Sequence, residues 1–175
     1  MLDALDRKDE AQTFRWRCFE STLLSQYLRD FLKRLPDFED IEAEERAMDH
    51  AAANPSLLLA LGFFQEWPSL ERAAQLMIDR DQEINGDRYE LLVPAAEALS
   101  ERFPLAATLA LRAMIDFTLS NARSKRYGYA AQHLVECEGL SSRIEDYRTF
   151  EPHAAYVARL KRDHGRKTGF WGHIS

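Results

Sequence analysis

A chain of 175 residues with 46% hydrophobic and 30% charged residues, seven glycines and six prolines suits a compact folded protein and excludes a disordered one. Its net charge of −6 and pI near 5.4 are far from the strongly basic balance that is usual for nucleic-acid-binding proteins. No apolar run reaches the roughly 18 residues that a membrane span requires, and the first residues are too acidic for a signal peptide, so we expect a cytoplasmic protein without a membrane partner.

The spacing of apolar side chains predicts a succession of helices. Over residues 9–34 they recur every three or four positions, which predicts one long helix that ends before Pro36. The acidic residues from Asp37 to Glu42 favour the start of the next helix, because negative charge is stabilised by the helix macrodipole there. Further helices are predicted, in chain order, over about 37–53, 55–64, 69–78, 89–103, 104–119, 127–140 and 152–164.

Three features near the middle of the chain predict local backbone geometry. Pro94 falls inside a predicted helix, where it removes a hydrogen bond at a cost of about 3 kcal/mol, so the helix over 89–103 is either kinked or begins only near Val93, and we favour the kink. Gly86 closes the preceding polar stretch and is expected to adopt the left-handed conformation. Asp87 and Glu90 have the spacing of a capping box for the helix that follows.

Pairs of adjacent alanines recur along the chain. The pairs that begin at Ala73 and Ala106 are 33 residues apart, and those that begin at Ala95 and Ala130 are 35 apart, which is the spacing of helical-hairpin repeats. Short side chains let two helices approach closely. We therefore predict an all-α fold of stacked antiparallel helical hairpins, a tetratricopeptide-like or HEAT-like α-solenoid of about seven to eight helices, in a single domain over 1–175.

The residue types that carry chemistry are scattered. The five histidines occur singly, and no short spacing of cysteine and histidine typical of zinc sites is present. The glycines form no phosphate-binding motif, and no serine lies in a nucleophile elbow. Cys18 and Cys137 lie among apolar neighbours and are expected to be buried free thiols. We predict no metal, no cofactor and no enzymatic activity.

Charge is unevenly distributed, with a balance of −10 over residues 1–102 and +4 over residues 103–175. Basic residues gather in two clusters of the second part, and aromatic residues follow in the tail. For Phe170 and Trp171 two interpretations stay open: they fold back to cover the end of the stack, or they are exposed anchors for a partner. The candidate interaction surface consists of Arg123, Lys125, Arg126, Arg162, Arg166, Lys167 and Trp171.

Stacked helical hairpins expose extended surfaces, so we expect a non-catalytic scaffold that binds a macromolecule, most naturally a protein. A homo-oligomer, in which the basic face of one copy meets the acidic half of another, is left open. Two other functions are alternatives: a nucleic-acid-binding module that uses the basic C-terminal face, which the acidic composition disfavours, and an enzyme whose site is assembled from residues distant in sequence.

The chain also resembles a bacterial family of unknown function. The likeness rests on residues 89–99, 112–116, 122–127 and 164–171, where the last segment reads His-Gly-Arg-Lys-Thr-Gly-Phe-Trp. The same segments are distantly similar to the helical C-terminal regions of SWIM zinc-finger proteins. The resemblance implies a tetratricopeptide-like helical fold and a chain that is the C-terminal part of a longer protein. The SWIM zinc motif is not present, so no metal role is carried over.

Overall fold

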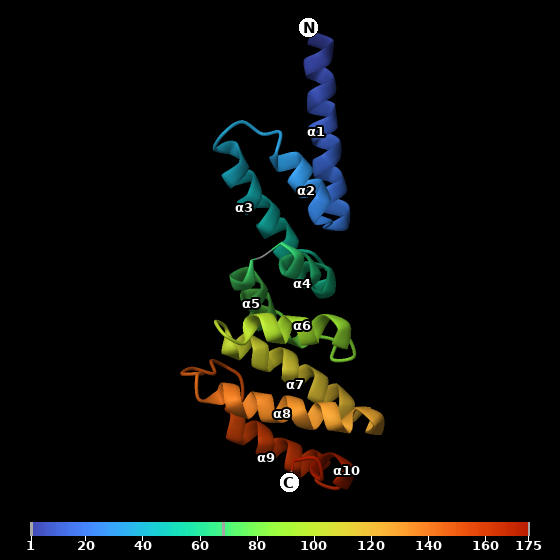
Figure 1. Ribbon diagram of the computed structural model, residues 1–175, viewed down its shortest axis with the longest axis vertical. Coiled ribbons are helices and arrows are strands. Elements are labelled where there is room, and N and C mark those ends of the chain that lie inside the picture. The colour runs from blue at the N-terminus through green and yellow to red at the C-terminus, as the bar shows by residue number, and fades with distance from the viewer. Residues whose placement is uncertain (1, 68, 175) are drawn as a thin grey trace. The chain divides into compact units, whose positions relative to one another are not determined.

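A computed structural model describes residues 2–67 and 69–174, with side chains from Arg7 onward (Figure 1). Within these ranges it contains ten α-helices, two short 3-10 helices and no strand, which confirms the all-α prediction. The α-helices are α1 (Leu2–Thr22), α2 (Ser25–Leu32), α3 (Glu39–Ala52), α4 (Leu57–Glu66), α5 (Leu70–Asp79), α6 (Tyr89–Leu99), α7 (Pro104–Ser120), α8 (Tyr127–Ser141), α9 (His153–His164) and α10 (Thr168–Trp171). The 3-10 helices are η1 (Asp81–Glu83) and η2 (Ser124–Arg126).

The number of helices is higher than the seven to eight predicted, for two reasons. The segment predicted as one helix over 9–34 is two helices, because Leu23 adopts a left-handed backbone with φ 53° and ends α1. The side chain of Leu23 is buried, so it continues the apolar pattern although the backbone does not continue the helix. In addition, tail residues form the short helix α10.

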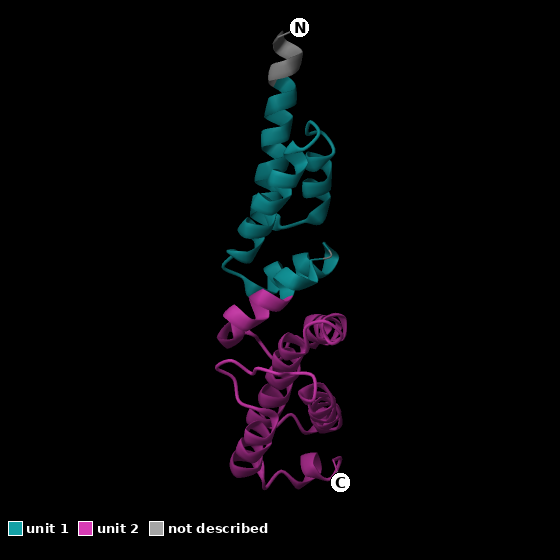
Figure 2. Ribbon diagram, turned by 90° about the vertical axis from the view of Figure 1, so that its left-hand side faces the viewer, with its two compact units in different colours: residues 1–73 teal, residues 74–175 magenta. Residues whose placement is uncertain are grey.

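The chain divides into two compact units, residues 1–73 and residues 74–175 (Figure 2). The boundary falls within α5. The single domain over 1–175 stays a prediction.

The core of the first unit is built from aromatic rings of α1 and α4. The rings of Phe19 and Phe63 have centroids 5.4 Å apart, and Phe64 is fully buried beside them. α2 folds back along α1, and Gln12 Nε2 donates a hydrogen bond of 3.1 Å to the carbonyl oxygen of Phe31 near the end of α2. Gln12 lies well before the turn between the two helices and Phe31 lies well after it, so α1 and α2 run antiparallel.

The second unit is organised around α7, most of which is buried. Arg126 and Asp87, at the starts of α8 and α6, form an ion pair of 2.6 Å. At the other ends of the same two helices, Arg143 Nη2 donates to the carbonyl oxygen of Ser100 at 2.6 Å. α6 and α8 therefore run in the same direction, with α7 reversed and packed against both, as Figure 1 shows.

The four alanine pairs with repeat spacing are buried, and each of their residues is at most 4% exposed. The pairs lie on α5, α6, α7 and α8. This confirms the prediction that the short side chains face the protein interior. It also explains why α7 contacts both of its neighbours, since a methyl group lets two helix backbones approach more closely than a longer side chain does.

Two local predictions in the second unit are wrong. Gly86 does not adopt the left-handed conformation, since no described glycine has a positive φ. It is required because the backbone passes so close to α7 that a Cβ atom would overlap the carbonyl of Ala113. The capping box is not formed either: the Asp87 carboxylate bonds Arg126, and no side chain caps the start of α6. Pro94 does lie inside a helix, as predicted, since α6 spans it.

Of the two interpretations of the tail, folding back is confirmed for Phe170. Its side chain is fully buried, and its ring meets that of Tyr127 edge-on with centroids 6.3 Å apart. Trp171 is partly buried, and its Nε1 donates a hydrogen bond of 3.0 Å to the carbonyl oxygen of His164. α10 therefore covers the start of α8.

Candidate binding groove

A groove of about 500 Å³ lies between α6 and α8, with α7 beneath it. The lining residues fall at positions i, i+4, i+7 and i+8 on α6 and at i, i+3, i+4 and i+7 on α8, so each helix contributes a single face. Leu111 supplies part of the floor. This α6–α8 groove is lined by Tyr89, Val93, Ala96, Glu97, Leu111, Arg126, Tyr129, Gln132, His133 and Glu136.

His133 is the polar group buried most deeply in the α6–α8 groove, with 7% of its surface exposed. Burial lowers its pKa, although the neighbouring Glu136 carboxylate opposes the shift, so the imidazole is neutral near pH 7. Its Nδ1 is 3.8 Å from Glu136 Oε1, too far for a hydrogen bond. Neither ring nitrogen has a hydrogen-bond partner among the described residues. Because both nitrogens are enclosed as well as unbonded, they could bond a ligand in the groove only after the imidazole turns toward it.

One end of the α6–α8 groove is held in place by Arg126. Its guanidinium pairs with Asp87 and lies 4.5 Å from the centroid of the Tyr89 ring. The Tyr89 hydroxyl in turn bonds Thr118 of α7. These contacts tie the starts of α6 and α8 to the end of α7. The groove is therefore rigid at this end, and the charge of Arg126 is already balanced.

The structure distributes the predicted interaction residues over several surfaces. Arg126 is the only one of them among the described lining residues of the α6–α8 groove. Arg162 pairs with its neighbour Asp163 at 2.8 Å on the surface of α9. Tyr127 follows η2 and contacts Phe170, so η2 and α10 lie at the same end of α8. Arg123, Lys125 and Arg166 are exposed, whereas Lys167 and Trp171 are partly buried.

The other residues of the groove were not predicted from the sequence, although one signal for the groove is present there. On α8, Tyr129, Gln132, His133 and Glu136 follow the spacing of one helix face. That face mixes an exposed tyrosine with polar groups, whereas the alanine pair on the same helix is buried. A helix with a buried small-residue face and a second aromatic and polar face is typical of one that also borders a groove.

A second hollow, of about 580 Å³, lies between α7, α9 and the loop before α9. Asp116 accepts hydrogen bonds from Tyr156 Oη at 3.1 Å and from Arg159 Nη2 at 3.3 Å. Arg159 also pairs with Glu151 at 2.9 Å. Burial raises the pKa of Asp116, while the charge of Arg159 acts in the opposite direction. These four side chains satisfy one another and join α9 to α7, whereas the buried Arg112, which lines the same hollow, has no hydrogen-bond partner for its Nε and Nη2 among the described residues.

The two cysteines are free. Burial raises the pKa of the Cys137 thiol to about 12, so it is not a thiolate nucleophile at neutral pH. Cys18 is only partly buried, which differs from the prediction that both thiols are enclosed. Among residues 2–67 and 69–174, no three histidine, cysteine or acidic side chains are grouped to hold a metal ion. None of the described helices combines the length and apolarity needed to cross a membrane.

The lowered pKa of His133 predicts a pH dependence of stability. Below its usual pKa of 6.5 the unfolded chain binds the proton more readily than the folded chain does, so protonation favours unfolding. The free energy of unfolding should therefore fall as the pH is lowered from about 7 to about 5, and His153, whose pKa burial also lowers, contributes in the same direction. In urea titrations across this range, His133→Gln should lose less stability than the wild type. Equal losses would contradict the prediction.

Comparison with known proteins places the whole chain in one family. No curated protein and no solved structure matches it. A family of unknown function (DUF6880) matches residues 1–173. The chain, with its helical second unit and the α6–α8 groove, therefore belongs to the family of unknown function DUF6880.

Proposed function

We propose that this protein is a non-catalytic interaction module whose α6–α8 groove binds a segment of a partner protein. The observation that supports the proposal is the buried His133, which lines the groove and whose two ring nitrogens have no hydrogen-bond partner in the described part of the chain. A bound segment would supply the missing hydrogen bond from its backbone or from a polar side chain. The remaining walls offer aromatic and aliphatic contacts, the usual composition of a ligand groove.

The charges of the groove indicate which segment it accepts. Glu97 and Glu136 line opposite walls, whereas the charge of Arg126 is balanced by Asp87. A partner segment should therefore carry an apolar side chain that reaches Val93 and Leu111, with a lysine or arginine beside it. Tyr129, which is 64% exposed, would be covered by the bound segment.

We also propose that α6, α7, α8 and α9 are stacked helical hairpins of the tetratricopeptide-like or HEAT-like type. The buried alanine pairs, their repeat spacing and the alternating directions of α6, α7 and α8 support this proposal. The two free cysteines favour a cytoplasmic location, where thiols stay reduced. The likeness to SWIM zinc-finger proteins stays a prediction and adds no support.

Affinity capture with matched variants tests the proposed function. Tyr129→Ala and Glu136→Lys alter the α6–α8 groove, whereas Val135→Ala and Glu138→Lys make similar changes on the same helix outside it. Proteins captured by the wild type should be retained by the two controls. For the groove variants we expect affinity to fall at least about tenfold, which corresponds to about 1.4 kcal/mol.

A direct readout is the His133 imidazole. Its nuclear magnetic resonance signals should shift when a captured partner, or a peptide from it, is added to the purified protein. A partner that binds all four variants equally and leaves these signals unchanged would show that the groove is not the binding site.

A further inference from the structure

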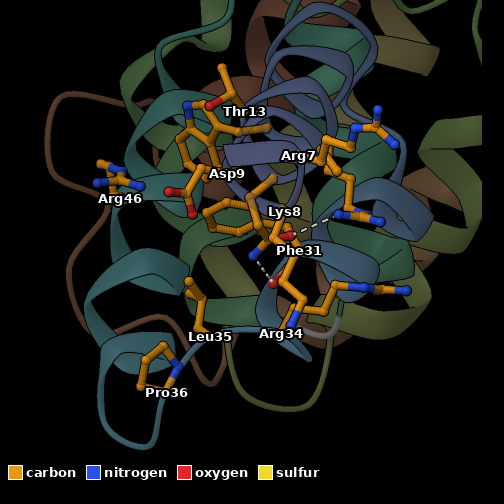
Figure 3. Close-up of a pocket in the computed structure, with 13 residues that line it drawn as sticks. Arg7, Lys8, Asp9, Thr13, Phe31, Arg34, Leu35, Pro36 and Arg46 are labelled. Atoms are coloured by element: carbon orange, nitrogen blue, oxygen red, sulfur yellow. Dashed lines mark hydrogen bonds between the residues drawn. The ribbon is translucent and has the colours of Figure 1, made fainter. Parts of the chain in front are cut away.

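A cleft of about 950 Å³ lies in the first unit, between α1, α2 and the segment that follows α2 (Figure 3). Residues 1–73 contain nine basic and fifteen acidic residues, yet five of the nine basic ones line this cleft with a single carboxylate, Asp9. In Figure 3, Arg34 and Arg46 lie on opposite sides of Phe31. The basic cleft carries Arg7, Lys8, Arg15, Arg34 and Arg46 around its rim.

The floor of the basic cleft is apolar and fixed in position. The rings of Trp16 and Phe31 have centroids 5.2 Å apart, and the guanidinium of Arg46 lies 4.5 Å from the centroid of Trp16. Trp16 Nε1 donates a hydrogen bond of 2.6 Å to Glu20 Oε1, which fixes the indole. A large apolar side chain entering here would contact rings that are already ordered, so little conformational entropy would be lost on binding.

The cations on the rim are held in place without being neutralised. Arg15 Nη1 donates to Gln12 Oε1 at 3.1 Å. Arg34 Nη1 donates to the carbonyl oxygen of Asp30 at 2.6 Å. Neither arginine forms an ion pair with a described carboxylate. The basic cleft therefore presents oriented cations to an anionic ligand.

The first unit also exposes an apolar and acidic surface, which begins just after Pro36, the last residue of the segment after α2 that lines the cleft. Phe38 is 84% exposed, and Ile41 is exposed as well. Asp37 and Glu39 flank Phe38 in the sequence and Asp40 follows, and Phe38 holds a left-handed backbone with φ 76° at the turn before α3. We call residues 37–41 the acidic tip. An exposed aromatic side chain in an acidic segment is complementary to an aromatic floor bordered by arginines.

The tip does not occupy the cleft of its own chain. Pro36 lines the basic cleft, and Phe38 follows it by two residues, a reach of only about 7 Å along the backbone. The exposure of Phe38 shows that this short connection leaves it in solvent. A second copy of the chain carries the same tip without this constraint.

We propose that two copies of this chain associate by placing the acidic tip of each in the basic cleft of the other. Because Pro36 lies between cleft and tip, a two-fold axis near this residue brings both contacts together in one closed interface. Apolar contact is made by Phe38 on Trp16 and Phe31, and the carboxylates of the tip face the arginines of the rim. This association uses the first unit and is independent of the α6–α8 groove in the second.

Analytical ultracentrifugation of the full chain tests the proposal. The wild type should be dimeric at low ionic strength and should dissociate as salt screens the charges. Phe38→Gly removes the aromatic anchor and relieves the left-handed backbone, so the variant should be monomeric. At high salt, where the wild type is monomeric as well, its thermal midpoint should be at least that of the wild type. Leu59→Ala, which shortens another exposed apolar side chain of the same unit, should leave the dimer intact. A wild type that stays monomeric up to about 1 mM overturns the proposal.

A charge exchange identifies the contact. Arg15→Glu with Arg34→Glu brings the net charge of the cleft side chains from +4 to zero, and Asp37→Lys with Asp40→Lys brings that of the tip from −3 to +1. Each double variant alone loses the charge attraction in both contacts and should be monomeric. An equimolar mixture of the two should form a heterodimer, because one of its contacts joins the unchanged tip to the unchanged cleft and the other places the new lysines against the new glutamates. If the mixture stays monomeric, or if either variant alone dimerises as the wild type does, the tip and the cleft are not partners.

Discussion

Replacing Tyr156 with alanine is expected to lower the free energy of unfolding of residues 74–175 by about 3–5 kcal/mol. The side chain is 1% exposed, and its ring lies 4.3 Å from the guanidinium carbon of Arg112 and 4.9 Å from that of Arg159. Truncation would leave a large cavity between α7 and α9 and would remove the ring face that both cations contact. Urea denaturation, followed by the circular dichroism of the helices, measures this loss of unfolding free energy.

Tyr156→Phe separates the ring from its hydroxyl. Burial raises the pKa of Tyr156 well above its ordinary value, so the hydroxyl stays protonated and donates to Asp116. The phenylalanine variant keeps the ring contacts and loses this single hydrogen bond, so it should cost only about 1 kcal/mol. If both variants cost the same, the hydroxyl rather than the ring would be the main contribution, and the packing argument would be wrong.

Replacing Gly86 with alanine is expected to cost about 3 kcal/mol, near the upper end of the usual range for overpacking. The added Cβ would lie 2.7 Å from Phe117 Cβ and would overlap the carbonyl of Ala113. The carbonyl belongs to the α7 backbone and the Cβ is attached directly to it, so neither can rotate away as the end of a long side chain can. The segment before α6 would have to move away from α7.

Gly139→Ala is the matched control for this prediction. Gly139 is an exposed residue inside α8, and a Cβ there would meet nothing within 4 Å. Alanine is the better helix former, so this variant should gain about 0.5–1 kcal/mol. Thermal denaturation of the two variants should therefore shift the midpoint in opposite directions. A neutral Gly86→Ala would show that the close approach to α7 is not tight.

The sequence predicted correctly those features that depend on neighbouring residues. Apolar spacing indicated an all-helical chain, and Pro104 indicated the start of α7, because proline is favoured in the first turn. The buried alanine pairs follow the same logic, since short side chains at repeated helical positions are useful only against another helix. Folding of the tail was left open, because the apolar character of Phe170 suits both a buried site and an exposed anchor.

Other features were decided only by tertiary packing. Leu23 and Phe38 adopt left-handed backbone conformations although neither is glycine, and their neighbours in the sequence do not indicate this. Burial of the side chain fixes the conformation of Leu23, and the turn before α3 fixes that of Phe38. Asp87 was predicted to cap its own helix, but Arg126, distant in the sequence, is its partner. His133 is likewise one histidine among five in the sequence. It becomes a candidate ligand-binding group only because α6 and α8 pack on α7 with a groove between them. The separation of α6 and α8 is set by the packing of side chains from all three helices, which the order of residues along the chain does not reveal.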